Sequence, residues 1–269
     1  MRTLRVVPLR RPWLWASSTL VAALAVALAL AVWRNPHIDR ATIAQFQFAP
    51  AILAGLRMTV VLALLAAVIG AVLGVLLAVM RLSVSPVLRL GSGFYTWLLR
   101  GTPLLVQILI WGNLALLFEH IGPFSTNALI TPFVASVLAL GLNEAAYMAE
   151  IVRAGVLAID RGQVDAAQAL GMSRALAMRR IILPQALRVI VPPAGNQFIS
   201  LLKATSLVSV IAGGDLLTAA ENISSANLRT VELMLVATFW YLVLTTVTSL
   251  GQYLLERRLA RDGTGLRAP

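Results

Sequence analysis

Six apolar runs divide the chain, and each is long enough to cross a bilayer as a helix. A bilayer core is about 30 Å thick, which a helix rising 1.5 Å per residue crosses in about 20 residues. The runs are Leu14–Trp33, Met58–Met80, Gly101–Phe118, Ile130–Ala149, Val189–Gly213 and Leu233–Leu255. The fourth contains a carboxylate, Glu144, and the fifth contains two prolines, a glycine and Lys203. Such irregular runs belong inside a helix bundle. The pattern predicts an all-α integral membrane protein with about six transmembrane helices.

The composition agrees with this prediction and excludes several kinds of chemistry. Hydrophobic residues make up 59% of the chain and charged residues 12%, against about 25% charged in ordinary soluble domains. The chain has no cysteine, which removes disulfides, thiol nucleophiles and cysteine-bound metals. The two histidines, His37 and His120, are too far apart in sequence to suggest a local metal motif. Metal and redox chemistry are therefore not expected.

The net charge of +11 is better explained by membrane topology than by nucleic acid. A nucleic-acid binder needs its basic residues on a solvated face, whereas here they lie between apolar runs. Basic residues near the ends of spans mark the cytoplasmic side. With the N-terminus inside, 17 of the 22 basic residues lie inside and 4 outside, with Lys203 within a span. We therefore predict that both termini are cytoplasmic and that no nucleic acid binds.

The first apolar run follows a basic start, as in a signal peptide, but a membrane helix is favoured. The run has about 20 residues, whereas a signal peptide's apolar core has 7–15, and no clear small-x-small cleavage site precedes Arg34. We expect a cytoplasmic segment over 1–13, an additional transmembrane helix over 14–33 and an external or interfacial segment over 34–54.

The second apolar run contains a G-x-x-x-G pair, Gly70 and Gly74. Such pairs let two helix backbones approach closely within a membrane. We interpret the pair as a helix-packing feature only.

The longest predicted cytoplasmic segment, 154–188, joins the fourth and fifth runs and carries the signals of two short helices. Residues 164–170 form an alanine-rich helical stretch, and Gly171 is typical of a residue that ends a helix. Ser173 can cap the next helix, and Pro184 marks where that helix stops or bends. Small side chains at this elbow allow a partner's surface to come close, so we predict a docking element.

This loop resembles the cytoplasmic signature of the permease subunits of bacterial ABC importers, E-A-A-x3-G-x9-I-x-L-P. The corresponding residues have the same spacing throughout: Asp165, Ala166, Ala167, Gly171, Ile181, Leu183 and Pro184. The one departure is Asp165, which replaces glutamate and shortens the side chain by one methylene.

Further strings resemble the polar amino acid subfamily of these permeases, which includes histidine, glutamine and arginine permeases. They are R-G-T-P-L-L-V-Q at 100–107, A-A-Y-x-A-E-I-x-R at 145–153, N-Q-F-I-S-L-L-K at 196–203 and T-S-L-V-S-V-I at 205–211. The resemblance extends from about 55 to 259 and leaves the first run outside. Three residues depart from the subfamily: Ala204 replaces an aspartate beside Lys203, Val164 a tryptophan, and Glu144 a small residue.

The resemblance implies a type I ABC importer permease fold, with a transmembrane domain over 55–256, a coupling loop over 154–188 and a tail over 257–269. Such a subunit lies in the cytoplasmic (inner) membrane and translocates polar amino acids or close analogues by alternating access. The implied coupling residues are Gly162, Asp165, Ala166, Ala167, Leu170, Gly171, Ile181, Leu183 and Pro184.

The chain has one lysine and no P-loop, G-x-x-x-x-G-K-[ST], so ATP would have to be hydrolysed by another subunit. The resemblance implies which partners these are. A separate cytoplasmic ATPase pair would bind ATP and magnesium, so the subunit itself is non-catalytic and holds no cofactor. A second permease chain, identical or related, would complete the pathway within the lipid bilayer. An extracytoplasmic solute-binding protein would deliver the ligand.

Two acidic residues of the fourth run have different expected environments. Glu150 lies three residues before Arg153, which places the two side by side on a helix near its cytoplasmic end. A structural ion pair is favoured there, with a pathway or gating role as the alternative. Glu144 is deeper and should face a cavity or a partner, so it is a candidate contact for a cationic amino acid.

Lys203 lies about midway along the fifth run, where an ammonium group needs a partner. It could pair with an acidic residue of another helix or contact a ligand carboxylate. Thr205 and Ser206 could bond across a dimer or to a ligand, although helix packing is favoured.

A secondary transporter or channel that works alone is the main alternative. Such proteins often contain inverted repeats and more spans. The chain shows no convincing internal repeat, and the elbow has no evident purpose without a partner. A membrane enzyme is weaker still, because the acidic residues lack a metal, a nucleophile or a histidine base at useful spacing.

Overall fold

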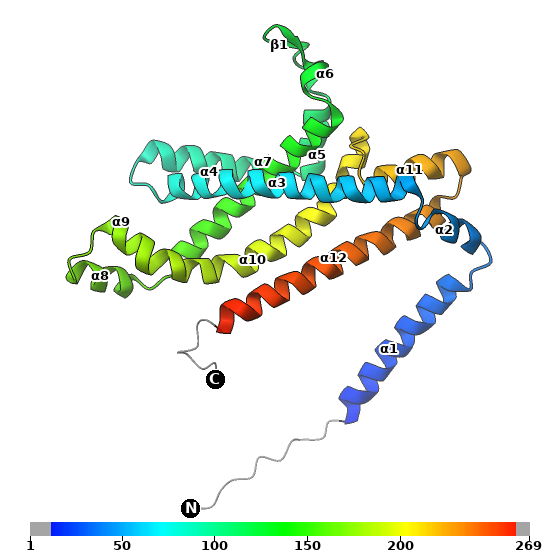
Figure 1. The fold of residues 1–269 in the computed structure, drawn as a ribbon, viewed down its shortest axis with the longest axis horizontal. Helices are drawn as coiled ribbons and strands as arrows, with labels where there is room; N and C mark the ends of the chain where they lie inside the picture. Colours follow the sequence, from blue (N-terminus) through cyan, green and yellow to red (C-terminus); the bar gives the residue numbers. More distant parts are fainter. Residues whose placement is uncertain (1–11, 262–269) are drawn as a thin grey trace, which may run out of the picture.

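The computed structural model describes residues 12–261, so most of the predicted N-terminal segment and the end of the predicted C-terminal tail lie outside the described residues. The described chain is almost entirely helical (Figure 1). Its α-helices are α1 (Pro12–Trp33), α2 (Arg40–Phe46), α3 (Pro50–Leu82), α4 (Pro86–Gly101), α5 (Leu104–Gly112), α6 (Thr126–Leu129), α7 (Pro132–Leu157), α8 (Arg161–Ala169), α9 (Arg174–Ala177), α10 (Leu183–Ala204), α11 (Leu216–Asn227) and α12 (Thr230–Arg261).

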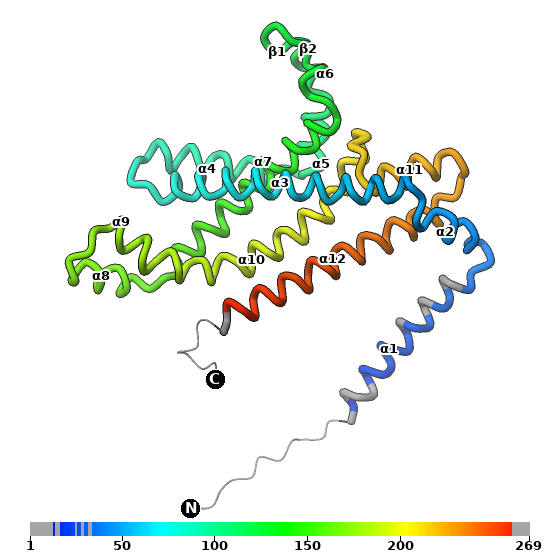
Figure 2. The backbone as a smooth tube through the Cα atoms, viewed as in Figure 1, coloured from blue at the N-terminus to red at the C-terminus, as the bar shows by residue number. Residues whose placement is uncertain are grey.

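Short irregular elements complete the fold. They are the 3-10 segments η1 (Leu114–Leu116) and η3 (Thr205–Ile211), the π segment η2 (Met178–Ile182), and the two-residue strands β1 (His120–Ile121) and β2 (Phe124–Ser125). The strands pair antiparallel, with His120 opposite Ser125. Figure 2 shows this hairpin projecting on one side of the bundle and the α8–α9 elbow at the left end.

Four of the predicted runs correspond to candidate spans. Within the described residues, α3, α7 and α12 are long and apolar enough to cross a membrane, and they cover the second, fourth and sixth runs. The segment Arg174–Ile211, which covers most of the fifth run, and α11, bent by 42° relative to it, together make a fourth candidate span. The first run is a helix, α1, as expected.

The third run, Gly101–Phe118, does not form one membrane-crossing helix, so that prediction is wrong. Thr102 is extended and precedes Pro103, a position where the α conformation is disfavoured, so the helix breaks there. The next helix, α5, has 9 residues, about 13 Å of rise, and ends at Gly112. Before the break, α4 folds back along α3 (Figure 1), although its charged and polar residues interrupt the apolar pattern.

The second helix of the elbow does not stop at Pro184. The chain passes from α9 through the π turn of η2 directly into α10, where Pro184 occupies the first turn. A proline is tolerated there because first-turn N–H groups have no partner within the helix.

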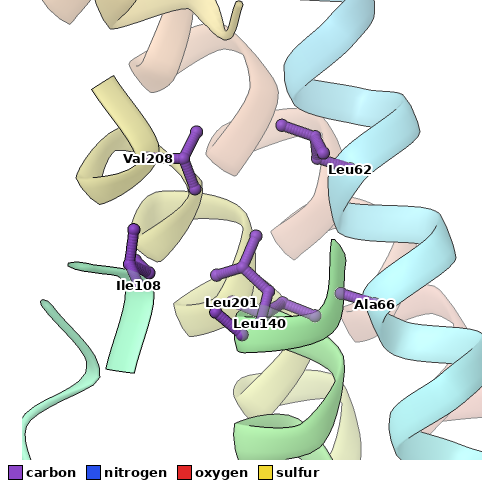
Figure 3. Close-up of a cluster of buried hydrophobic side chains, with 7 residues drawn as sticks. Leu62, Ala66, Ile108, Leu140, Leu201 and Val208 are labelled. Carbon is purple, nitrogen blue, oxygen red and sulfur yellow. The ribbon is translucent and has the colours of Figure 1, made fainter. Parts of the chain in front are cut away.

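The most extensive contact between two helices joins α3 and α7 and confirms the packing role of the G-x-x-x-G pair. Gly70 lies against the side chain of Glu144, and Gly74 lies against Met148. A cluster of buried apolar side chains continues this contact into α5, α10 and η3 (Figure 3). Its labelled members are Leu62, Ala66, Ile108, Leu140, Leu201 and Val208.

We expect Gly70→Ala to destabilise the bundle. An added Cβ would lie 2.3 Å from Glu144 Cγ and 2.8 Å from Glu144 Cβ, which forces α3 and α7 apart. Overpacking of this kind costs about 1–3 kcal/mol. The measurement is the midpoint of thermal unfolding in detergent.

Gly91→Ala is the matched control, because a Cβ on this α4 glycine meets nothing within 4 Å. Alanine is also the better helix former, so this midpoint should not fall. Equal midpoints for the two variants would contradict the close approach at Gly70.

A buried polar cluster centred on Asp215 holds α11 against its neighbours. Asp215 caps α11 by accepting hydrogen bonds from the N–H groups of Leu217 and Thr218, and it also accepts one from the hydroxyl of Tyr241 in α12. Thr59 of α3 accepts a hydrogen bond from the N–H of Leu216 at 3.0 Å. The short helix after the bend is therefore fixed to both α3 and α12.

The segment before α3 is attached to the start of α12. The N–H of Asp39 donates to Glu232 Oε1 at 3.0 Å, and the guanidinium of Arg229 lies within 4 Å of both carboxylates. The hydroxyl of Thr42 and the N–H of Ala41 donate hydrogen bonds to the Asp39 carboxylate. Both bonds lower the pKa of this carboxylate, and the Thr42 bond has the larger effect. Asp39 therefore stays charged as the cap of α2.

Candidate functional site

A cavity of about 450 Å³ lies where α4, α5, α7 and α10 meet, a volume in the range of small-molecule sites. Its walls come from the end of α4 and the break after it, from one face of α7 and from one face of α10. The lining residues are Arg100, Gly101, Thr102, Pro103, Leu104, Asn143, Glu144, Tyr147, Gln197, Ser200, Leu201 and Ala204. The cavity is thus mainly polar on α7 and α10 and carries two opposite charges.

Glu144 is the acidic group of the cavity and is only 4% exposed. Gln197 Nε2 donates to its Oε2 at 2.9 Å, and the stem of the side chain occupies the space left by Gly70. No cation within the described residues forms an ion pair with it. A buried carboxylate with a single neutral donor retains the capacity to bind a cationic group.

Arg100 is the basic group of the cavity. Its guanidinium carbon lies 5.2 Å from the ring centroid of Tyr147, a cation–π distance. No carboxylate of the described chain lies within 4 Å of this guanidinium. The arginine is therefore oriented by an aromatic face and keeps its donors available for an anionic group.

A buried amide network holds the break between α4 and α5 in place. Gln107 Nε2 lies 2.8 Å from the carbonyl oxygen of Leu99, 3.1 Å from that of Thr102 and 2.8 Å from the Thr102 hydroxyl. Asn143 of α7 donates to Leu99 O at 3.0 Å and to Gln107 Oε1 at 3.2 Å. The carbonyls freed by the break are thereby satisfied, and Arg100 is fixed beside α7.

The elbow between α7 and α10 has the two predicted caps, Ser173 and Gly171, and a third, Asp160, that was not predicted. Asp160 caps α8 by accepting from the N–H of Gly162, and Ser173 caps α9 by accepting from that of Leu176. Gly171 has φ +76°, and the N–H groups of Gly171 and Met172 bond to the carbonyls of Gln168 and Ala167. This is a Schellman motif, which ends a helix where glycine is favoured.

The predicted coupling residues lie on both faces of the elbow. Ala167 is buried, whereas Leu170 is 82% exposed. The other exposed members are Gly162, Asp165, Ala166, Gly171, Leu183 and Pro184, and Ile181 is half-buried. The elbow therefore presents small residues around the exposed side chain of Leu170, with Leu183 as a second, less exposed leucine.

Comparison with known proteins gives the family. The model for the "binding-protein-dependent transport system inner membrane component" matches residues 70–261, most of the chain. The chain belongs to this family. It is the permease subunit of an ABC importer, a transport component of the inner membrane rather than a catalyst.

Curated relatives cover most of the chain. The arginine transport system permease protein ArgU of Corynebacterium glutamicum is 39% identical over 263 residues, which is 96% of this chain and 83% of the relative. The L-cystine transport system permease protein TcyB of Bacillus subtilis is 37% identical over 81% of this chain and 90% of its own length.

Solved structures confirm the fold. An amino acid ABC transporter crystallised with histidines matches with a TM-score of 0.74 and 39% identity, covering 82% of this chain and 99% of that one. The MetNI methionine ABC transporter, at 19% identity and a TM-score of 0.58, shares the fold. These likenesses do not favour a transporter or channel that works alone.

The permease brings only one of its predicted charged residues into the cavity, Glu144. Glu150 and Arg153 form the expected ion pair, with Arg153 Nε 3.0 Å from Glu150 Oε2, and do not line the cavity. Lys203 is exposed on α10 and has no ion-pair partner within the described residues.

The two hydroxyl residues after Lys203 bond to their own helix. Thr205 donates to the carbonyl of Leu202 and Ser206 to that of Lys203, each at 2.8 Å, and neither lines the cavity. This local bonding agrees with the helix-packing interpretation.

Several cavity residues of the permease were not singled out from the sequence as site residues. Arg100, Tyr147, Gln197 and Ser200 all lie in the strings that carry the family resemblance. Helical spacing was a usable signal, because Asn143, Glu144 and Tyr147 share one face of α7. The position of Gln197 opposite Glu144, 53 residues away, had no local signal.

Proposed function

We propose that this permease carries polar amino acids or close analogues, and that they bind in the cavity formed by α4, α5, α7 and α10. An amino acid presents an ammonium and a carboxylate, which are complementary to the Glu144 carboxylate and the Arg100 guanidinium. A cationic side chain would add a second group for Glu144. The names of the arginine and L-cystine transport relatives support this substrate class.

The observation that carries the proposal is the hydrogen bond between Glu144 on α7 and Gln197 on α10. The elbow of α8 and α9 connects the same two helices, α7 and α10. A displacement of the elbow would move α7 relative to α10 and alter the cavity between them. Ligand access and elbow position are therefore linked through one pair of helices.

The energy would come from a separate pair of cytoplasmic ATPase subunits that bind ATP and magnesium. Each ATPase would accept the elbow surface around Asp165–Gly171 of one permease chain, and a second permease chain would complete the pathway. An extracytoplasmic binding protein would deliver the ligand. Closure of the ATPases would push the two elbows together and switch the cavity between its inward-facing and outward-facing states.

The test is uptake of labelled arginine into proteoliposomes containing the permease with its ATPase, with loaded binding protein supplied. Glu144→Gln keeps the shape of the side chain and its bond from Gln197 but removes the charge. We expect the KM for arginine to rise about tenfold, which corresponds to the binding free energy that one charge-assisted hydrogen bond contributes. Basal ATP hydrolysis should persist.

Glu150→Gln is the matched control, since it removes the same charge from the same helix outside the cavity. Its KM should stay within about twofold of the wild type, because the ion pair that it breaks is half-buried outside the cavity and touches no ligand group. An equal rise in KM for both variants would contradict a ligand contact at Glu144. Unchanged uptake by Glu144→Gln would do the same.

A further inference from the structure

A second cavity lies inside the elbow, between the end of α7, one face of α8, and the α9–η2 segment. Its volume is about 660 Å³. Its apolar wall includes Val156, Leu157, Val164, Met178 and Ile182, and its two charged lining residues are Arg161 and Arg174. The amino acid cavity shares none of these residues.

The two arginines have no acidic partner in the part of the chain that the structure describes. Both line a cavity that contains no carboxylate. Two guanidinium groups above an apolar wall are complementary to an amphiphile with an anionic head and an apolar tail. Fork-shaped guanidinium groups suit phosphate oxygens in particular.

The position of the cavity suits a membrane lipid. Val156 and Leu157 are the last residues of a candidate membrane span, so the cavity opens at the depth where headgroups lie. Leu157 is 57% exposed and Met178 is 40% exposed, which extends the apolar wall to the surface. Basic pockets at the ends of spans bind anionic headgroups.

The cavity lies on a different side of α8 from the surface proposed for ATPase docking. Arg161, Val164 and Gln168 follow one another at helical spacing and line the cavity. Asp165 and Ala166 are exposed and do not line it. The opposite wall is η2, a π turn, which is a geometry found often at functional sites.

We propose that this elbow cavity binds one anionic phospholipid, with its phosphate between Arg161 and Arg174 and an acyl chain along Leu157 and Met178. The lipid would fill the space between α8 and the end of α7, and so support the elbow from inside the membrane interface.

The test is native mass spectrometry of the full-length chain in detergent, titrated with phosphatidylglycerol or with phosphatidylcholine. We expect one phosphatidylglycerol to bind at least about tenfold more tightly than phosphatidylcholine. Arg161→Gln/Arg174→Gln should remove this preference. Arg179→Gln/Arg180→Gln, which removes two nearby exposed charges outside the cavity, should retain it.

A second variant keeps both charges and fills the cavity instead. Gln168→Trp places a large side chain at an exposed lining position, so it should also weaken phosphatidylglycerol binding. Each variant is compared at equal helix content by circular dichroism. If the Arg161→Gln/Arg174→Gln protein does not fold, the Gln168→Trp result decides alone.

Four results would overturn the proposal. The two lipids could bind with equal affinity. The Arg179→Gln/Arg180→Gln control could lose as much of the preference for phosphatidylglycerol as the Arg161→Gln/Arg174→Gln variant does. Excess inorganic phosphate could displace the lipid fully, which would indicate a phosphate site without a tail site. Added ATPase subunit could abolish lipid binding, which would indicate that the cavity accepts an acidic protein segment.

Discussion

Replacing Gly171 by valine should remove nearly all stimulation of ATP hydrolysis by the loaded binding protein, whereas asparagine should retain most of it. Gly171 has φ +76°, a left-handed conformation that is rare for β-branched residues and tolerated by asparagine. The two side chains have similar sizes, so the two variants differ chiefly in how readily the residue adopts the left-handed backbone conformation. Nothing lies within 4 Å of an added Cβ, so a clash within the chain contributes little.

The magnitude follows from the cost of the strained backbone. Valine at this φ costs about 2 kcal/mol, or about thirtyfold in the population of the capped elbow. A helix as short as α8, with 9 residues, has little stability of its own to absorb that loss. The surface from Asp165 to Leu170 would then lose its fixed shape, and closure of the ATPases would not reach α7 and α10.

The measurement is ATP hydrolysis in proteoliposomes with and without loaded binding protein, for wild type and both variants. If asparagine and valine reduce stimulation equally, the bulk of the side chain at the docking surface is responsible. If both variants keep full stimulation, the elbow does not couple hydrolysis to transport. In either case, circular dichroism must show that the rest of the helix bundle is intact.

Local features were predictable from the sequence because neighbouring residues determine them. The caps at Ser173 and Gly171 involve residues within five positions along the chain, and both were expected. The ion pair between Glu150 and Arg153 needs only helical spacing. The apolar runs that became α3, α7 and α12 have the length that a bilayer requires.

The third run shows why hydropathy alone was insufficient. The run Gly101–Phe118 is apolar, yet Pro103 ends the preceding helix and Gly112 ends α5. The helix α4 was missed because Arg89 and Arg100 interrupt its sequence and only one of its faces packs against the bundle. The chain forms α4 before this run and the short α5 within it, where the sequence pattern indicated one long helix.

The cavity depends on contacts between residues that are distant in sequence. Gly70 makes room for Glu144, and Gln197 donates to it from a third helix. The acidic residue itself was predictable, because an unpaired carboxylate in a span must face a cavity or a partner. Its partners were not, because one sequence does not specify which faces of α3, α7 and α10 meet.

Gln107→Leu should destabilise the permease more than any other single change considered above. Leucine has a similar volume but leaves the carbonyl of Thr102 without its amide donor, takes one of two amide donors from the carbonyl of Leu99, and removes an acceptor from Asn143. Gln107 is only 7% exposed, so water cannot easily replace these bonds. At about 1 kcal/mol for each of three groups, the loss is about 3 kcal/mol.

The measurement is the thermal midpoint in detergent, with Gln185→Leu as the matched control. Gln185 is half-buried, and its side chain donates a local hydrogen bond to Ile181 O in the preceding π segment, so the loss of this bond should cost under about 1 kcal/mol. Equal midpoints for the two variants would contradict a stabilising role for the network.

Arginine uptake provides a second readout that separates this network from simple helix packing. Because Gln107 fixes the break that presents Arg100 to the cavity, any folded Gln107→Leu protein should also show a raised KM for arginine. Gln185→Leu leaves the break intact and changes a residue that does not line the cavity, so its KM should stay near that of the wild type. A normal KM in folded Gln107→Leu protein would mean that Arg100 reaches the cavity without the network.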